Sequence, residues 1–203
     1  MVWGKRSKLS FTKIFSLLLL LGGSVFLVLG ITGIWTQHVS VGKSLQEAKT
    51  ITMVNSPRPK AEIETTVDTF VPKIGQVLGL ISLPNDKKLP IIQGTETPQL
   101  KKGVGHYSKS SFPGQGSQVI LSGHRDTVFS HLGELKKGDQ IRVKLPYGSF
   151  TYTVDHTTIV MADNQEVIHP TDREELVLTT CYPFYYIGNA PKRYIVYAYP
   201  VKD

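Results

Sequence analysis

The chain has a single cysteine, Cys181, among its 203 residues. One thiol cannot form a disulfide within the chain, and it cannot supply the thiolate pair of many structural zinc sites. No set of His, Cys, Asp and Glu residues has zinc-like spacing, so the sequence predicts no metal site. Two interpretations of Cys181 remain: a buried cysteine that acts as a small hydrophobic residue, or a thiolate nucleophile that works with a histidine.

Charge is absent from residues 14–35, and acidic residues are absent from residues 1–13. The uncharged stretch has 22 residues; as a helix it would be about 33 Å long, enough to cross a hydrocarbon core of about 30 Å. A cleaved signal peptide is the alternative, but its apolar region is only about 7–15 residues long, and no A-x-A site follows here. We therefore expect a transmembrane helix at 14–35, with the basic flank 1–13 in the cytoplasm and everything after Trp35 outside the cell.

The exported part has no excess of positive charge, although the whole chain carries a net charge of +7. Residues 1–60 hold eight Lys and Arg residues and one acidic residue, while residues 61–203 hold fifteen residues of each sign. The basic character therefore belongs to the membrane end of the chain, and it does not indicate nucleic-acid binding.

Large apolar residues are scarce from residue 36 to residue 70, where the composition is polar. We expect an extracellular linker here, with a short helix at about 44–52 that is too weakly amphipathic to form a domain. Residues 71–203 are then enough for one folded domain with one core.

The folded part has the pattern of a mostly β protein, without internal repeats. Short apolar or alternating runs, separated by turn residues, predict strands at 77–83, 89–93, 118–122, 140–145, 150–161, 175–180 and 193–201. Thr97-Pro98 predicts the start of a brief helix that ends before Gly103, and residues 129–135 allow a helical turn. So many short strands in one domain favour a closed β-barrel with one or two short helices.

Cys181 ends one of these apolar runs and is followed at once by Tyr182-Pro183. A thiol at the point where a strand opens into a loop has the placement expected of a reactive group. Among the six histidines, His124 is the best candidate partner, because it follows a predicted strand and stands beside Gly123 and the polar Arg125. We expect solvated structural roles for the others: His38, His106, His131, His156 and His169.

A cationic group is the third candidate member of the site. Acyl transfer at a carbonyl creates an oxyanion, which a fixed cationic donor can stabilise. Lys192 and Arg193 begin the last strand, and alternation turns them to opposite faces, so only one of them can face Cys181. We choose Arg193, because a guanidinium is planar and multidentate; an exposed basic pair at a loop end is the alternative.

These residues resemble the signature of the sortases. The motifs GVGHY, LSGHRDTVF, LTTCYPF and NAPKRYI occur in this order over residues 74–200, and together they are most similar to the class D sortases of spore-forming Gram-positive bacteria. One departure is Val177, where the usual TLxTC pattern has Thr; this β-branched exchange should affect packing and not chemistry.

The resemblance implies a membrane-anchored cysteine transpeptidase with an eight-stranded sortase barrel. Cys181 would attack the carbonyl after Thr in an LPxT-like sorting signal and form a thioacyl enzyme, which an amine of a peptidoglycan precursor would resolve. His124 would be the acid and base, and Arg193 would bind the substrate backbone and the oxyanion. Thr180 would be an additional oxyanion or substrate donor. The partners would be surface proteins with sorting signals; no cofactor is expected, and calcium dependence is left open.

Two other classes of protein fit parts of the pattern. A cysteine protease on the outer side of the membrane would use the same Cys181 and His124 with water as the acceptor. A noncatalytic cell-surface β-domain would need neither group.

Overall fold

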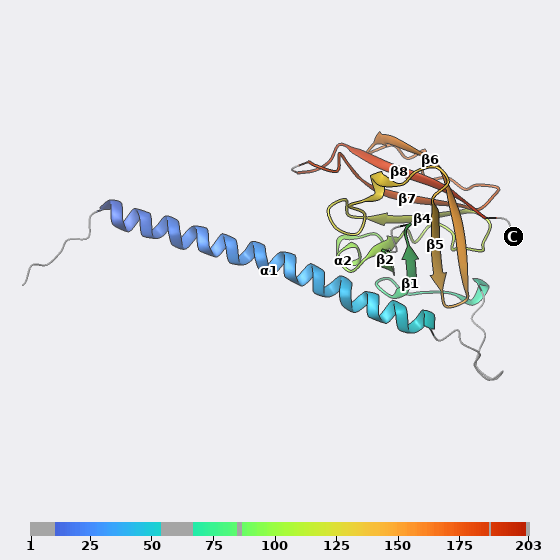
Figure 1. Cartoon of the computed structure of the whole chain (residues 1–203), viewed down its shortest axis with the longest axis horizontal. Helices are drawn as coiled ribbons and strands as arrows, with labels where there is room; N and C mark the ends of the chain where they lie inside the picture. The colour runs from blue at the N-terminus through green and yellow to red at the C-terminus, as the bar shows by residue number, and fades with distance from the viewer. Residues whose placement is uncertain (1–10, 54–66, 85–86, 187, 202–203) are drawn as a thin grey trace, which may run out of the picture. The chain divides into compact units, whose positions relative to one another are not determined.

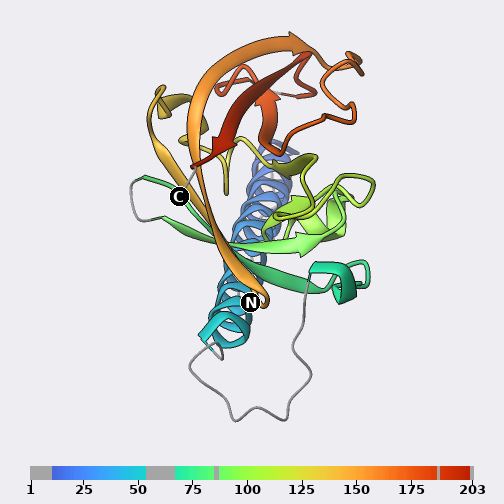
Figure 2. The same cartoon turned by 90° about the vertical axis from the view of Figure 1, so that its right-hand side faces the viewer.

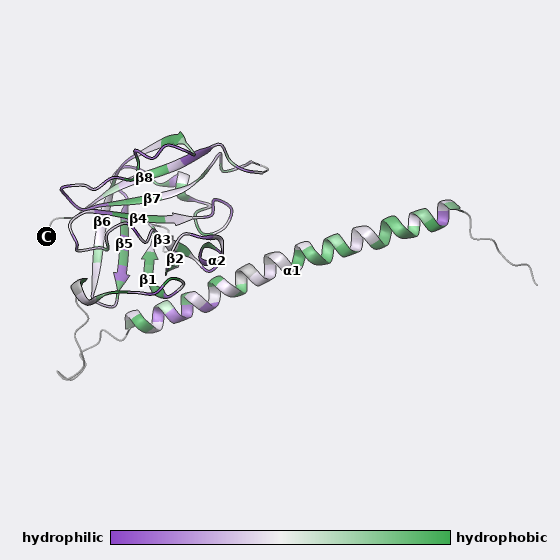
Figure 3. Ribbon diagram, turned by 180° about the vertical axis from the view of Figure 1, so that it is seen from behind, coloured by the Kyte–Doolittle hydropathy of each residue, from purple (hydrophilic) through white to green (hydrophobic). Residues whose placement is uncertain are grey.

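The computed structural model describes residues 11–53, 67–84, 87–186 and 188–201. The chain divides into two units, one up to Val39 and one from Ser40 onward. The described residues of the first unit, 11–39, belong to a long helix, α1 (Phe11–Met53). Residues 11–33 of this helix form a 23-residue apolar stretch that can cross a membrane by length and composition. Figure 3 shows this stretch as the most continuously hydrophobic part of α1.

The C-terminal part of α1 corrects the expected linker, because residues 36–53 are helical and the compact unit begins at Ser40. Ala48 is fully buried and packs with Val77, Leu80 and Ile92 of the first two strands. The buried face of this helix consists of small residues at a spacing of four, Ser44, Ala48 and Thr52. Leu45 and Ile51 also pack against this cluster but are only partly buried, so large apolar side chains form no wide stripe by which the sequence pattern could reveal this face.

Eight strands close into the predicted barrel, in the order β1-β2-β3-β4-β7-β8-β6-β5 (Figures 1 and 2). Their bounds are β1 Val77–Ser82, β2 Lys88–Gln93, β3 Val104–His106, β4 Gln118–Gly123, β5 Gln140–Leu145, β6 Gly148–Met161, β7 Glu175–Tyr182 and β8 Lys192–Pro200. The pairs β2·β3 and β4·β7 are parallel, and the other pairs are antiparallel. Seven of these strands match predicted ones, whereas β3 was missed because it has only three residues.

Short helical segments connect the strands. They are η1 Val67–Thr69, α2 Thr97–Leu100 and η2 Leu132–Glu134. The helix predicted at Thr97 is present, but its N-cap is Glu96, one residue earlier than predicted. The segment expected to make a helical turn at 129–135 contains η2.

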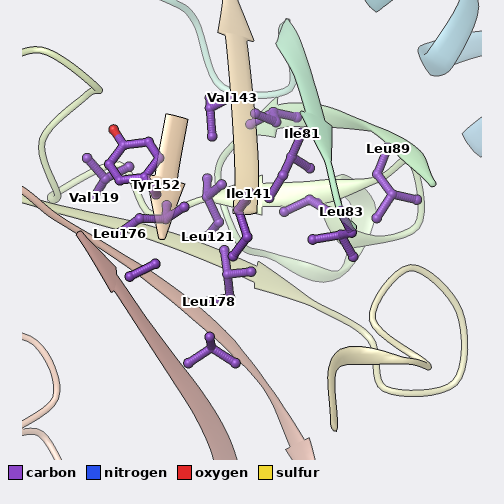
Figure 4. Close-up of a cluster of buried hydrophobic side chains, with 14 of the residues drawn as sticks. Ile81, Leu83, Leu89, Val119, Leu121, Ile141, Val143, Tyr152, Leu176 and Leu178 are labelled. Carbon is purple, nitrogen blue, oxygen red and sulfur yellow. The ribbon is translucent and has the colours of Figure 1, made fainter. Parts of the chain in front are cut away.

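The barrel interior holds the main core, which alternate residues of the strands fill. Tyr152, Leu121, Ile141 and Leu176 point toward one another there (Figure 4). A second cluster lies on the outer face of β4, β7 and β8 and contains Ile120, Val177 and Ile195, with Val167 from the connection before β7. Because neighbouring residues of a strand face opposite sides, these two clusters define the inward and outward faces of β7.

Candidate active site

Three predicted site residues lie side by side at the ends of adjacent strands. In the parallel pair β4·β7, Gly123 is the partner of Thr180, and the next residues along the two strands are His124 and Cys181. In the antiparallel pair β7·β8, Cys181 is the partner of Arg193. Cys181 therefore lies between His124 and Arg193, at one end of the row β4-β7-β8 that Figure 1 shows.

The site lies on the outer face of the barrel. Leu176 and Leu178 belong to the interior core, whereas Val177 belongs to the outer cluster. Continued alternation places the Cys181 side chain on the face of Val177. Cys181 is partly exposed, so the structure contradicts the interpretation of this residue as a buried hydrophobic cysteine and leaves the thiol accessible.

Gly123 and the turn after it fix the position of His124. A Cβ on Gly123 would lie 2.6 Å from Phe129 Cδ2 and 2.7 Å from Val128 Cγ2, so only glycine lets these two buried residues close the end of the barrel. The backbone N–H of Phe129 donates to the His124 carbonyl over 3.0 Å. His124 is thus held at the start of a tight turn, with a partly exposed side chain.

The structure corrects the role expected for the Thr180 side chain. Thr180 is only 3% exposed, and its hydroxyl donates to the Gly123 carbonyl over 2.7 Å. Alternation turns this side chain to the face opposite Cys181, so the hydroxyl is not directed at the thiol. It joins the ends of β4 and β7 instead, and through Gly123 it positions His124.

Arg193, the residue preferred over Lys192 on the sequence alone, is the cross-strand partner of Cys181. Lys192 is the partner of Tyr182 in the register and is exposed. The Arg193 Nη1 donates to the carbonyls of Ala190 and Lys192, over 3.2 and 3.0 Å. These bonds use one nitrogen, so the guanidinium keeps further N–H donors for a substrate.

The other described histidines lie outside this row. His106 was expected at the surface, but it is 1% exposed. Its Nδ1 lies 2.8 Å from Gln93 Oε1 and its Nε2 lies 3.0 Å from the Ser111 carbonyl. Burial lowers its pKa. β3 places His106 between β2 and β4, and this short strand was the element that the sequence pattern missed.

Exposed histidines make local contacts, as expected of structural residues. The partners are Glu134 for His131, Asp155 and the Tyr197 ring for His156, and the Glu166 carbonyl for His169. The His38 side chain lies outside the described part of the structure. Within the described residues, no group of three or more His, Cys, Asp or Glu side chains could hold a metal ion.

The connection between β7 and β8 is anchored against the turn after His124. Phe184 packs against Tyr182 and Tyr194, and a Cβ on Gly133 of η2 would lie 2.6 Å from Phe184 Cε2. Arg125 hydrogen-bonds to this connection as well. In the sequence, Arg125 stands out only as a polar neighbour of His124, because no sequence pattern shows which loop a neighbouring side chain contacts.

Comparisons with known proteins agree with this arrangement. A sortase domain model matches residues 82–201. The chain is 42% identical to sortase D of Bacillus subtilis (strain 168), over 91% of this chain and 96% of that protein. It is 29% identical to sortase A of Bacillus anthracis, over 60% of this chain and 58% of that protein.

Solved structures show the same fold. The sortase D5 transpeptidase of Clostridium perfringens matches with a TM-score of 0.68 and 22% identity, over 81% of this chain and 99% of that chain. The catalytic domain of Bacillus anthracis SrtD matches with a TM-score of 0.56 and 36% identity, over 71% and 97% of the two chains. With its thiol at the end of β7 of a closed barrel, the chain belongs to the sortase family of cysteine transpeptidases and is of the class D type.

Proposed function

We propose that this sortase cleaves an LPxT-type sorting signal after Thr and joins the released carbonyl to an amine of a peptidoglycan precursor. The observation that supports this most directly is the row His124, Cys181 and Arg193 on one outer face of β4-β7-β8. A nucleophile, a group that can transfer a proton, and a cationic donor are the three requirements of acyl transfer through a thioester.

The first half of the reaction forms the thioacyl enzyme. The Cys181 sulfur attacks the carbonyl carbon of Thr, and the carbonyl oxygen takes up the electron pair next to the Arg193 guanidinium. When the oxyanion collapses, the C–N bond breaks and the proton of His124 goes to the leaving amine. The developing negative charge exists only during this step, so a donor aimed at it lowers the barrier.

The second half reverses these roles with a new amine. The acceptor nitrogen attacks the thioester carbon, His124 takes a proton from that nitrogen, and the C–S bond breaks to return the Cys181 thiolate. One amide bond is broken and another is formed, so the cycle needs no external energy source. Nor does it call for a metal; transfer rates that stay unchanged when EDTA is added would agree with this.

The topology of the chain is the second part of the proposal. The apolar residues 11–33 of α1 anchor the enzyme, the basic residues before them remain in the cytoplasm, and the barrel faces the cell wall. The surface proteins and the peptidoglycan amine are then on the same side of the membrane as Cys181. Protease added to intact protoplasts should remove the barrel; a barrel that is protected, or released in soluble form, would contradict this topology.

Mass spectrometry of the full chain in detergent micelles tests the reaction. We expect a panel of Leu-Pro-X-Thr-X peptides to give an acyl adduct on Cys181, and added hydroxylamine to convert the adduct into the hydroxamate. Cys181→Ala is the control that should show no adduct. An adduct that yields only the free acid at high hydroxylamine concentration would favour a cysteine protease. The absence of any adduct would refute the proposed function.

A further inference from the structure

We infer that Arg125 is a positioning residue that holds the β7–β8 connection beside His124 and thereby favours the amine over water as acceptor. This inference rests on the proposed function, because it concerns the second half of that reaction. Its structural part concerns a loop position that can be measured without any substrate.

Arg125 makes specific contacts with the connection. Its Nη2 donates to the carbonyls of Tyr186 and Gly188, over 2.7 and 3.1 Å, and its Cζ lies 5.8 Å from the centre of the Tyr186 ring. Both hydrogen bonds have a charged donor, which makes them stronger than bonds between neutral groups. Nη1 is buried and has no hydrogen-bond partner among the described residues, a cost that the contacts of Nη2 must offset.

The strand order shows how these contacts affect the path of the β7–β8 connection. β7 lies between β4 and β8, so the shortest path from β7 to β8 leads away from β4. Arg125 belongs to the β4 side, yet it bonds to the middle of the β7–β8 connection. These bonds therefore hold the middle of the connection toward the β4 side, to which His124 also belongs.

Further anchors link the same connection to the catalytic row. Before the segment that Arg125 holds, Phe184 packs closely against Gly133. After it, the Ala190 carbonyl accepts a hydrogen bond from Arg193. A shift of the middle segment would therefore disturb the backbone that fixes the Arg193 guanidinium, so Arg125 can influence a donor with which it has no contact of its own.

The chemical step most sensitive to this position is the resolution of the thioester. Water is present at about 55 M, so an amine wins only if it is held near the thioester and His124 while the approach of water is restricted. A connection held toward the β4 side would narrow the approach to Cys181. A loosened connection would admit water and would also place the acceptor less well.

The experiment compares four variants of the full chain in detergent micelles. Arg125→Ala removes the contacts, and Arg125→Lys keeps the charge and one donor group. Tyr186→Ala removes the ring but keeps the backbone carbonyl. Arg173→Ala is the matched control, because Arg173 also lies over a tyrosine ring, 4.1 Å from the centre of Tyr199, but near the opposite end of β7.

Hydrogen exchange measures the structural part. Arg125→Ala should raise the exchange of the amides in residues 184–186 and 188–190 about tenfold or more, since two charge-assisted bonds are lost. Arg125→Lys should restore part of the protection, while Tyr186→Ala and Arg173→Ala should leave it close to that of the unmodified chain. Unchanged exchange in Arg125→Ala would overturn the inference, whatever happens to activity.

The partition of product measures the functional part, with a Leu-Pro-X-Thr-X peptide as donor and hydroxylamine as acceptor. We expect Arg125→Ala to raise the ratio of hydrolysis to transfer about tenfold, as restricted access and orientation are lost. A variant that only loses stability would lower both products together and keep their ratio, which would overturn the inference. If the unmodified chain forms no adduct with any peptide, the proposed function fails while the exchange result stands.

Discussion

Cys181 and Arg193 are direct partners in the antiparallel register of β7 and β8. Residues opposite each other on such strands have Cβ atoms about 4.5–5.5 Å apart and side chains on the same face. The neighbouring Lys192 pairs with Tyr182 and therefore points to the other face. The register thus separates two basic residues that are adjacent in sequence and places only Arg193 on the face of Cys181.

The first prediction concerns this pair of basic residues. Arg193→Lys keeps the charge but loses the planar fork, so transfer should fall about 10²- to 10³-fold, which is about 2.7–4 kcal/mol for one oxyanion donor. Lys192→Ala should have a mild effect, because its side chain is exposed. Steady-state transfer rates of the two single mutants provide the measurement.

Alkylation of Cys181 is the control for this comparison. It should proceed in Arg193→Lys, since His124 is the group proposed to handle the proton. A near-normal Arg193→Lys enzyme beside a severely impaired Lys192→Ala enzyme would mean that the cationic donor has been assigned to the wrong residue.

The second prediction is that Cys181→Ala and His124→Ala each abolish transfer and leave the barrel folded. Both residues lie at strand ends and are partly exposed, so neither substitution opens a cavity in the core. The double mutant should be no worse than either single mutant, because the two groups act as a unit. Circular dichroism and thermal melting check the fold; an unfolded Cys181→Ala chain would indicate a structural role for the cysteine.

The third prediction separates a donor role of Thr180 from a positioning role. Thr180→Val keeps the shape of the side chain but removes the hydrogen bond to the Gly123 carbonyl. It should lower the free energy of unfolding by about 1–3 kcal/mol, since a buried carbonyl loses its partner. Transfer should fall less than tenfold, in contrast to the 10²- to 10³-fold loss typical of an oxyanion donor.

Thermal melting and transfer rates, measured on the same Thr180→Val sample, distinguish the two roles. A large loss of rate at unchanged stability would show that the hydroxyl acts on the substrate, against the geometry seen here.

Much of the barrel could be predicted because most of its strands have a clear apolar or alternating sequence pattern. Alternation between the two faces gave the hairpin of β5 and β6, and the apolar run before Cys181 gave β7. The same alternation showed that only one of Lys192 and Arg193 can face the thiol, and the planar, multidentate guanidinium was the reason for choosing Arg193. The same alternation places the Thr180 side chain on the face opposite Cys181, so the expectation that its hydroxyl acts at the thiol conflicts with the strand pattern.

Other features depend on contacts that no local pattern records. The strand β3 is too short to show a period, and its placement between β2 and β4 is what buries His106. In the C-terminal part of α1 the most buried residues are small, and Ala48 packs with Val77, Leu80 and Ile92 of β1 and β2. Arg125 acts across a distance of about 60 residues in sequence, with Tyr186 and Gly188 as its partners.

The fourth prediction tests the packing of the C-terminal part of α1. Ala48→Asp introduces an unpaired carboxylate at a fully buried position, so the barrel should lose the contact with this helix and about 1–3 kcal/mol of stability. Thr50→Asp is the matched control, since the same side chain enters at an exposed position two residues away.

Thermal melting and hydrogen exchange of residues 40–53 check this prediction in the full chain. Equal melting temperatures and equal exchange for the two Asp variants would show that the helix contributes nothing to the stability of the barrel.

The fifth prediction is a pH dependence of stability that arises from His106. In the folded protein, burial lowers the pKa of His106 below the ordinary histidine value of 6.5. Below about pH 6.5 the unfolded chain binds a proton at this position, whereas the folded chain does not. The free energy of unfolding should therefore be highest above pH 6.5 and should fall as the pH is lowered toward the folded-state pKa, by at most about 1.4 kcal/mol per pH unit.

Urea unfolding of the full chain at pH 8, 7, 6 and 5 provides the measurement, with His106→Gln as the comparison. At pH 8 the imidazole is neutral in both states, so the difference there reports only the packing and the lost contacts with Gln93 and Ser111. Between pH 7 and pH 5 the variant should lose less stability than the unmodified chain, because it has no group to protonate at this position. Parallel curves over that range would mean that the folded barrel accepts the proton as readily as the unfolded chain, and that the buried imidazole contributes nothing to the acid sensitivity of the fold.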